Sequence, residues 1–564
     1  MVDNYYKYKI EKNNITSPLI NEIEEYVEGI LDNNIPQIPY SSYIDYYKFG
    51  IRKSFEDTYF ERRKQLTALA LYLQLNNSEK AIYYFKELLW SISNEFSWCL
   101  AAHLEYDDAG FIDGAYKNID LFSAETAQAL SEILLIHSDK LDEILVKHIK
   151  FQIKDRVIEP FLNRNFHWET ATHNWSAVCA GCIGIIALLL EEGERQDIIL
   201  NRVETSLNYY LSGFGKDGVS LEGIGYWTYG FGYYIYYKAL NGEEISEDDI
   251  KKVISIANFP EKVQISESEF VPFSDVSPNM MLPSGLISYL YEKYDISLPL
   301  ITQITSFNFD HCYRWAHVSR NLWWTSDTIF NMKLKNSENY FEEAKWFTLR
   351  DDDLFFAIKG GNNDEPHNHN DLGSFVVAVD GNLVITDLGA GQYTAGYFGE
   401  ERYKYVHTRS YYHSVPFINK KEQCFNKVNC KLKMQKQDKF ENDLEINITN
   451  GYNEDEINSV IRRVNYKYSD KIITINDLIN SKASIEINEG FISYIKPSLI
   501  NDGIISWELG NKKLNLKYNS LAFSVNIEKI RIKNHHGEDI IAYRVGLISN
   551  KIKSFDEKFK IYIE

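Results

Sequence analysis

The hydrophobic pattern of the chain changes its period once, and this change constrains the fold more than any other feature. Between Tyr59 and Leu240, apolar residues recur at three- and four-residue spacing, which predicts amphipathic helices separated by short polar breaks. From about Trp346 the period is two, and runs rich in β-branched and aromatic residues lie between turns, which predicts strands. We therefore expect a helical half followed by a β half.

The two patterns predict a multidomain protein with two architectures in series. Helices with no strand pattern between them are expected to pair antiparallel, and enough such pairs around a centre form an (α/α) toroid, or incomplete barrel. The strand-like runs span roughly 200 residues and predict a large antiparallel β-sandwich. We expect the toroid domain in residues 1–340 and the β-sandwich domain in residues 341–564.

The charge balance excludes some partners. The chain has 80 acidic and 60 basic residues, for a net charge of -20. This charge argues against a nucleic acid or an anionic membrane as partner, and an acidic substrate would need a locally basic cleft. The 40 tyrosines would suit a saccharide groove, because each has an apolar face and a polar tip, although ordinary packing accounts for most of them.

The N-terminus and the cysteines indicate the cellular compartment that the sequence predicts. The first residues, MVDNYYKYKIEKNN, have no apolar signal core, and no run approaches the roughly 18 residues of a membrane span. The sequence as given predicts a cytoplasmic protein, or a periplasmic or secreted one if a signal had been removed. Cys179 and Cys182 lie in an apolar helical run without a second pair at zinc spacing, which favours packed thiols. The oligomeric state stays open, with a homodimer as one option.

Residues 360–413 concentrate chemically active side chains. His367 and His369 are two apart, so on an extended chain both would leave the same face. Two β-branched runs joined by an Asp-Gly turn predict a hairpin; Asp387 ends its second strand, and a third run reaches His413. Imidazoles and a carboxylate from neighbouring strands can converge, which suits a divalent metal or a catalytic imidazole beside one.

Two other interpretations of this segment stay open. A protein with 13 histidines can gather several on a polar surface by chance. His367, His369 and Asp371 also match the HxHxD signature of metallo-β-lactamase-type hydrolases. That signature usually continues into a further His, where this chain has Leu372, and it usually follows a buried strand rather than a Gly/Asn/Pro loop.

Two segments of the helical half carry weaker signals. Asn174 lies at a helix start, where its amide and the unpaired backbone N–H groups could bind an anion, or where it could simply be an N-cap. The run from Asp217 to Tyr234 has five glycines among Tyr and Trp, which close approach to a ligand would explain. Tyr226 and Tyr229 would share a helix face there, and a phenol could act as general acid or base.

Five segments together resemble one known family, the heparinase II/III-like polysaccharide lyases. The matching segments are His367–Phe375 (HNHNDLGSF), Val384–Gly389 (VITDLG), Tyr411–Val415 (YYHSV), His173–Trp175 (HNW) and Glu222–Trp227 (EGIGYW). The resemblance covers nearly the whole chain in order. It implies an α/α toroid followed by an antiparallel β-sandwich, in agreement with the periodicity.

The resemblance implies specific roles. These lyases cleave uronic-acid polysaccharides by β-elimination. Asn174 would neutralise the uronate carboxylate, while His367 and Tyr226 would act as base and acid, in an order that depends on the uronic acid epimer. A divalent metal, usually zinc, would be held by three residues: His369, Asp387 and His413.

Further residues follow from the same resemblance. Tyr403 or Tyr405 would match a second catalytic Tyr found in some relatives, and Arg409 could bind an acidic group of the substrate. Some relatives have a His directly after the Asn, where this chain has Trp175; His173 lies on the other side instead. Tyr229 remains an alternative to Tyr226.

The predicted function is that of a carbon–oxygen lyase acting on an acidic oligosaccharide or polysaccharide that contains uronic acid, such as a glycosaminoglycan or an alginate-like chain. Two alternatives remain: a non-catalytic glycan-binding protein of the same fold, and a metal-dependent hydrolase using the HxHxD cluster. The sequence determines neither the glycan nor whether cleavage is endo or exo.

Overall fold

The computed structural model divides the chain into two compact units, each built from more than one segment. It describes residues 10–107, 110–242, 245–277, 279–330, 332–399, 401–425, 428, 430–501 and 503–564. Unit 1 comprises Met1–Phe214, Tyr226–Ala257 and Met281–Met332. Unit 2 comprises Gly215–Gly225, Asn258–Met280 and Lys333–Glu564.

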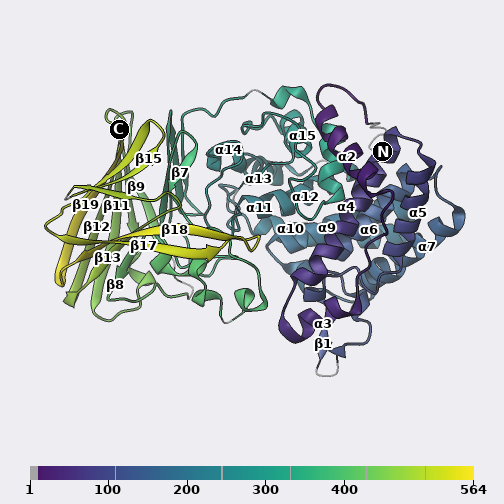
Figure 1. Cartoon of the computed structure of the whole chain (residues 1–564), viewed down its shortest axis with the longest axis horizontal. Helices are drawn as coiled ribbons and strands as arrows, with labels where there is room; N and C mark the ends of the chain where they lie inside the picture. The colour runs from purple at the N-terminus through teal and green to yellow at the C-terminus, as the bar shows by residue number, and fades with distance from the viewer. Residues whose placement is uncertain are drawn as a thin grey trace. The chain divides into compact units, whose positions relative to one another are not determined.

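Unit 1 is helical, as the three- to four-residue spacing predicts (Figure 1). Its longer helices are α2 (Ser17–Ile30), α3 (Tyr40–Phe49), α4 (Lys53–Leu75), α5 (Glu79–Ser93), α6 (Leu121–Ile136), α7 (Glu143–Ile153), α9 (Asn174–Leu190), α10 (Gly193–Ser212), α12 (Gly232–Asn241), α13 (Glu247–Ala257), α15 (Ser284–Tyr294) and α16 (Trp315–Trp324). Helices that follow one another in the chain pack in pairs, including α4 with α5, α9 with α10, and α15 with α16.

Helix α9 is the centre of this unit, because it packs against α6, α10 and α12. Its sequence is apolar on every side, as expected for a helix enclosed by others. A β-carbon on Gly184 would lie 2.4 Å from the Tyr237 ring, and one on Gly181 would lie 2.8 Å from the Tyr233 backbone oxygen. These two glycines therefore allow α12 to approach α9 closely.

The described part of unit 2 contains three antiparallel sheets. One has the order β3-β4-β5-β6-β7, another β14-β15-β16-β19-β12-β11-β10-β9, and the third β17-β18-β13-β8. The strands are β3 (Ser337–Phe341), β4 (Trp346–Asp351), β5 (Leu354–Lys359), β6 (Phe375–Val379), β7 (Asn382–Ile385), β8 (Pro416–Ile418), β9 (Lys431–Gln437), β10 (Glu441–Asn447), β11 (Ile457–Lys467), β12 (Ile472–Ile485), β13 (Ile487–Ser493), β14 (Ser498–Asn501), β15 (Ile504–Leu509), β16 (Lys512–Lys517), β17 (Phe523–Lys533), β18 (Asp539–Ser549) and β19 (Ile552–Ile563).

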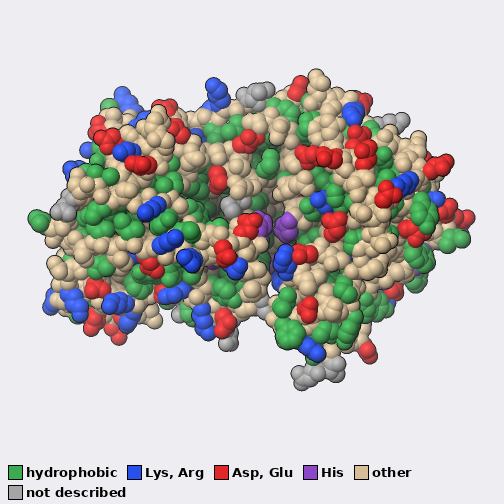
Figure 2. All heavy atoms as spheres, in the orientation of Figure 1, with side chains coloured by type: hydrophobic (Ala, Val, Ile, Leu, Met, Phe, Trp, Pro, Cys, Tyr) green, Lys and Arg blue, Asp and Glu red, His purple; other side chains and the backbone are tan. Residues whose placement is uncertain are grey.

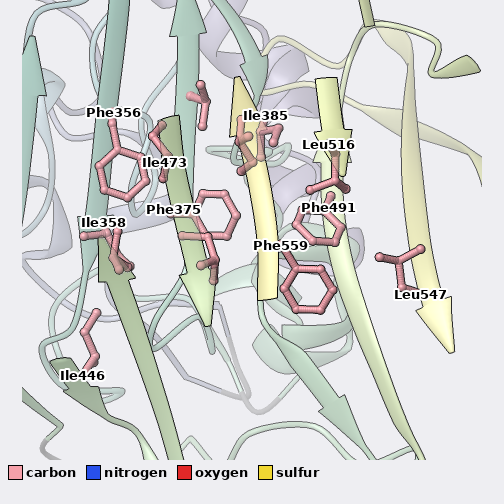
Figure 3. Packing of buried hydrophobic residues seen from close by; sticks show 14 of the residues in the cluster. Phe356, Ile358, Phe375, Ile385, Ile446, Ile473, Phe491, Leu516, Leu547 and Phe559 are labelled. Atoms are coloured by element: carbon pink, nitrogen blue, oxygen red, sulfur yellow. The ribbon is translucent and has the colours of Figure 1, made fainter. Parts of the chain in front are cut away.

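One hydrophobic cluster joins the three sheets. Phe356 on β5, Phe375 on β6, Phe491 on β13 and Phe559 on β19 all belong to it and are buried (Figure 3). The alternation of buried and exposed residues along β11 is that of a strand with one face on the core. This shared core fixes the ends of β5, β6 and β7, from which the histidine-rich loops depart.

One expectation from the sequence needs correction. The third run before His413 is not a strand: the chain there forms short 3-10 turns, including Val406–Thr408 and Ser410–Tyr412, before β8 begins. The units also differ from a single division at residue 340, because residues 215–225 and 258–280 belong to unit 2. The β6–β7 hairpin, in contrast, lies where the Asp-Gly turn predicts it.

The surface mixes both signs of charge. Asp and Glu side chains alternate with Lys and Arg over the face shown in Figure 2. The net charge of -20 is therefore not gathered into one patch on that face. Among the residues that the structure describes, no helix is both long and apolar enough to cross a lipid bilayer.

Candidate active site

His367 lies in the loop between β5 and β6, in a strained backbone conformation. Its φ is 57°, in the left-handed region that a side chain with a β-carbon rarely adopts. The expectation that His367 and His369 leave one face of an extended chain is therefore wrong. Strained residues of this kind persist where the surroundings fix them, and they cluster at functional sites.

A buried carboxylate, that of Asp275, holds the loop in place. Its Oδ2 lies 2.8 Å from Nδ1 of His367, and its Oδ1 lies 3.0 Å from Nε2 of His369. The hydroxyl of Tyr397 donates to Oδ1 at 2.7 Å, and Nη2 of Arg402 donates to Oδ2 at 3.1 Å. Asp275 thus joins the two histidines of the HNH motif through its two oxygens.

The surroundings keep this carboxylate ionised. Burial alone would raise the pKa of Asp275, but the hydrogen bonds from His367 and His369 and the charge of Arg402 hold that pKa well below its usual range. Burial opposes a charge on His369 too, yet the neighbouring carboxylates of Asp275 and Asp387 raise the pKa of the imidazole to about 9. The centre of the site is therefore strongly polar although it is buried.

His369, Asp387 and His413 are grouped as the resemblance implies. Nδ1 of His413 lies 2.8 Å from Oδ2 of Asp387, and Nδ1 of His369 lies 3.7 Å from Oδ1. Each imidazole is anchored through its other nitrogen: Nε2 of His369 on Asp275, and Nε2 of His413 on the backbone oxygen of His407 at 2.9 Å. Nδ1 of His369 is buried and has no hydrogen-bond partner among the described residues.

These features fit a divalent metal. Two imidazole nitrogens and a carboxylate facing one another are a donor set that zinc accepts. A metal-binding His usually donates its second N–H to a carboxylate or a backbone carbonyl, which fixes the ring orientation. Both His369 and His413 have such an anchor, and a bound ion would give the unpartnered Nδ1 of His369 a ligand bond.

Asp371 is the fourth group that faces this cluster. Potential ligand atoms of His369, Asp371, Asp387 and His413 all lie within 4.8 Å of one another. Asp371 is also 2.9 Å from the ammonium of Lys359, with both side chains almost fully buried. His367 is not in this group, so the HxHxD residues do not gather as one set.

Three other residues singled out in the β half have partners of their own. The Tyr403 hydroxyl donates to Oδ1 of Asn368 at 2.9 Å, next to His367 in the chain. The Tyr405 hydroxyl lies 2.8 Å from that of Thr394. Each of these two tyrosines packs against another aromatic ring, Tyr403 on Phe425 and Tyr405 on Tyr397.

Arg409 forms an ion pair with Glu422 at 2.7 Å, and neither side chain is fully buried. Its charge is therefore partly neutralised within the protein. Tyr403 has the most direct link to the HNH motif of these three residues, because its bond to Asn368 lies one residue from His367.

In unit 1, Asn174 is the first residue of α9 and is buried. The N-cap position belongs to His173, so the interpretation of Asn174 as the N-cap is wrong. Trp175 packs against His103, with ring centroids 5.1 Å apart, and against His167 at 5.5 Å. An imidazole thus lies beside the position after the Asn, although it comes from a distant part of the sequence.

Tyr226 and Tyr229 have different environments. Tyr226 ends the short helix α11 (Ile224–Tyr226) and is half-buried. Tyr229 is buried in a π-helical turn (Trp227–Phe231), with the Arg314 guanidinium 3.9 Å from its ring centroid. Burial and the nearby Glu125 carboxylate raise the pKa of Tyr229 well above its usual value.

The glycines around these tyrosines have a packing role. A β-carbon on Gly230 would lie 3.1 Å from Cα of Asn174, and one on Gly223 would lie 2.3 Å from a side-chain methyl of Val276. Close packing within the protein explains why these two positions are glycine, and no ligand is needed to explain them.

Sequence reasoning missed four residues that lie beside His367 or its partner carboxylate: Asp275, Arg402, Tyr397 and Glu222. Oε1 of Glu222 lies 3.6 Å from Nε2 of His367. Glu222 falls within the EGIGYW segment, so its position was a usable signal. Asp275 is 92 residues from His367 in an irregular segment, where no local pattern marks it.

Comparison with known protein families gives a match for part of the chain. Residues 334–542 match the family model described as heparinase II/III-like, C-terminal. This match confirms the resemblance carried by the HNHND segment. No curated protein sequence matches the chain.

Solved structures with the same fold are similar over nearly the full chain. The crystal structure of heparinase III has 14% identity and a TM-score of 0.64, covering 98% of this chain and 93% of that one. The heparan sulfate lyase HepC from Pedobacter heparinus has 12% identity and a TM-score of 0.62, covering 99% and 85%. Chondroitin AC lyase from Streptomyces coelicolor A3, in complex with chondroitin sulphate, has 8% identity and a TM-score of 0.54, covering 100% and 82%. The predicted fold, an incomplete toroid followed by antiparallel sheets, is thereby confirmed.

Proposed function

We propose that the protein is a polysaccharide lyase that cleaves a uronic-acid-containing oligosaccharide or polysaccharide by β-elimination. The observation that carries the proposal is His367, held in a left-handed conformation with Nδ1 on the ionised carboxylate of Asp275. An imidazole bound in this way is suited to transfer a proton at Nε2. The family match and the structural neighbours, which are a heparinase, a heparan sulfate lyase and a chondroitin AC lyase, support lyase chemistry over other uses of the fold.

The reaction needs three contributions. The proton on C5 of a uronate is weakly acidic, and neutralising the adjacent carboxylate stabilises the enolate-like intermediate, an effect typically worth several kcal/mol. We assign this task to Asn174, whose amide lies at the N-terminus of α9, where the positive end of the helix dipole favours an anion. His367 and Tyr226 then move the protons, one from C5 and one to the leaving O4.

Tyr226 suits this role better than Tyr229. A proton-transfer group works best when its pKa lies near the working pH. Burial raises the pKa of Tyr229 well above the usual phenol value, and its ring is covered by Arg314. Tyr226 is half-buried and thus more accessible to a substrate.

We further propose that His369, Asp387 and His413 hold a divalent metal, with zinc as the best fit to the donor set. When bound, the ion would fix the two imidazoles and the Asp387 carboxylate as a rigid support for the neighbouring loop. His369 is two residues from His367, so this support would help to hold the catalytic imidazole.

Two competing functions make different predictions. A glycan-binding protein of the same fold would bind oligosaccharides and release no product. A hydrolase using His367, His369 and Asp371 would release products without a new double bond. The separation of His367 from the other three potential ligands, and the ion pair of Asp371 with Lys359, favour the lyase.

A substrate panel tests the proposal. Heparan sulfate, hyaluronan, chondroitin and alginate oligomers would each be incubated with the protein while the absorbance of unsaturated uronates is followed. We expect absorbance to rise with at least one glycan, and to stay flat for His367→Ala when that variant keeps the thermal stability of the wild type. If the wild type produced no unsaturated uronate from any uronic-acid glycan, the proposed lyase activity would be refuted.

A further inference from the structure

The Asp275 carboxylate is the only group within the described residues that hydrogen-bonds both His367 and His369 through their side chains. Oδ2 lies 2.8 Å from Nδ1 of His367, and Oδ1 lies 3.0 Å from Nε2 of His369. The carboxyl group is fully shielded from solvent, and Tyr397 and Arg402 occupy further acceptor positions on the same two oxygens. Four donors from unit 2 thus converge on one side chain.

This arrangement fixes which nitrogen of each imidazole carries hydrogen. An ionised carboxylate can only accept hydrogen bonds, so Nδ1 of His367 and Nε2 of His369 must each be the N–H that donates. Proton transfer at His367 then takes place at Nε2. At His369, the nitrogen that faces Asp387 is Nδ1, which a metal ion would need unprotonated.

The segment that carries Asp275 is itself held on two sides. The hydroxyl of Ser274 donates to the backbone oxygen of Leu221 at 2.9 Å. The backbone N–H of Ala390 donates to the oxygen of Val276 at 3.0 Å. Ala390 is three residues after Asp387, so the loop with the candidate metal ligand and the segment with Asp275 are fastened together.

We propose that Asp275 is the positioning residue of this site, which fixes the reactive tautomer of His367 and the metal-binding orientation of His369 at the same time. The inference rests on the proposed lyase function for its catalytic consequence. The expected tautomer of His367 and the expected effect on metal affinity do not depend on that function. Loss of the Asp275 charge is expected to weaken proton transfer and metal binding together.

The tautomer can be measured in the unmodified protein. With ¹⁵N-labelled histidine, the two ring nitrogens of a neutral imidazole give distinct shifts for the protonated and unprotonated nitrogen, and the His367→Gln variant identifies the His367 signals. We expect Nδ1 of His367 to carry the hydrogen, with or without added zinc. A wild-type ring with hydrogen on Nε2 instead would overturn the proposal, and no variant of Asp275 is needed to see it.

The variant Asp275→Asn tests the double role. An Asn side chain has one acceptor oxygen, so it can accept from only one of the two imidazoles in the present orientation. We expect kcat to fall by about 10²- to 10⁴-fold, as when an orienting Asp is replaced in a catalytic triad, with a smaller change in KM. We expect zinc affinity, measured by competition with a chelator, to fall by about 10- to 100-fold.

Asp477→Asn is the matched control. Asp477 is also a fully buried carboxylate of unit 2, paired with Arg462 at 2.7 Å in the β-sandwich. We expect this control to lower thermal stability without changing the His367 tautomer or the zinc affinity. Equal loss of zinc affinity in both variants would show a general effect of removing a buried charge and would overturn the proposal, as would an unchanged kcat in Asp275→Asn.

The two hypotheses can fail separately. If the wild type shows no lyase activity on any glycan, the proposed function fails, whereas the tautomer and zinc measurements still decide the role of Asp275. If lyase activity is present and Asp275→Asn keeps full kcat and full zinc affinity, the positioning role fails alone.

Discussion

The backbone oxygen of Val276 lies only 2.3 Å from where a β-carbon on Gly389 would stand. Gly389 also has a φ of 60°, in the left-handed region. It follows Asp387 by two residues, and its N–H donates to that carboxylate at 2.9 Å. Gly389, which ends the VITDLG segment, is therefore needed for two reasons. Its backbone is left-handed, and the segment that carries Asp275 passes too close to leave room for a β-carbon.

The first prediction concerns this glycine. Gly389→Ala should destabilise the protein because the new β-carbon forces the two backbones apart, and the displaced Asp387 should bind metal more weakly. Chemical denaturation with and without zinc measures both effects. Gly510→Ala is the control, because Gly510 has a φ of 63° and a β-carbon there would meet no atom within 4 Å.

The control isolates the cost of the left-handed conformation, about 1–2 kcal/mol for an L-residue. The loss of stability in Gly389→Ala should clearly exceed that cost, because the contacting atom belongs to the backbone of Val276 and cannot move as easily as a side chain. Equal destabilisation by the two substitutions would show that the contact with Val276 is of no consequence.

The second prediction concerns the metal. Removing a bound divalent ion with a chelator should lower the melting temperature, because a ligand that binds only the folded state stabilises it. His413→Ala should contain less metal by elemental analysis and should lose the response to the chelator. His148→Ala serves as control, since His148 packs on Trp90 in unit 1. A wild-type protein without metal that melts identically with and without added zinc would contradict the proposed site.

The sequence predicts the parts of this fold that depend on local periodicity. The β6–β7 hairpin and the helices α4, α9 and α10 lie where spacing and turn chemistry indicate, because each buries one or more faces of its own sequence. The grouping of His369, Asp387 and His413 followed from the family resemblance, and the structure brings the three together.

Other features depend on contacts that the sequence does not show locally. His367 has a left-handed backbone conformation, and its side chain is bound by Asp275, which lies far away in the chain. The residues before His413 have strand-like composition but form short turns, where the hydroxyl of Thr408 and the backbone N–H of Asn370 find partners within the two loops. Asp275 itself has no motif, so only the folded chain shows its contacts with the two imidazoles.

The third prediction concerns acid stability. Burial lowers the pKa of His137 from 6.5 to about 4, despite its hydrogen bond to the backbone oxygen of Ala70 at 2.7 Å. The pKa of His137 is lower in the folded than in the unfolded chain, so its contribution to stability is present above pH 6.5 and is lost as the pH falls toward 4. A shift of this size corresponds to about 3 kcal/mol.

The measurement is the free energy of unfolding against pH. His137→Gln should be less stable than the wild type near neutrality, because its packing changes, and should lose less stability between pH 6.5 and pH 4. Parallel curves for the two proteins over this range would show that the protonation of His137 does not contribute to acid unfolding.

The fourth prediction separates the two tyrosines of unit 1. Tyr226→Phe removes the phenol that we assign to proton transfer and should lower kcat by about 10²- to 10⁴-fold on the glycan that the panel identifies. Tyr229→Phe should keep most of its kcat, because the pKa of Tyr229 is raised well above the usual phenol value by burial. Circular dichroism and melting temperature would establish that both variants fold.

The opposite result would be informative about the π-helical turn. If Tyr229→Phe lost activity and Tyr226→Phe kept it, the catalytic phenol would be the one beneath Arg314, and the cation would have to lower its pKa during turnover. Arg314→Met would then be expected to abolish the same activity. Because Arg314 also pairs with Glu125 at 2.9 Å and Asp310 at 2.7 Å, that variant would need the stability control before its kinetics are interpreted.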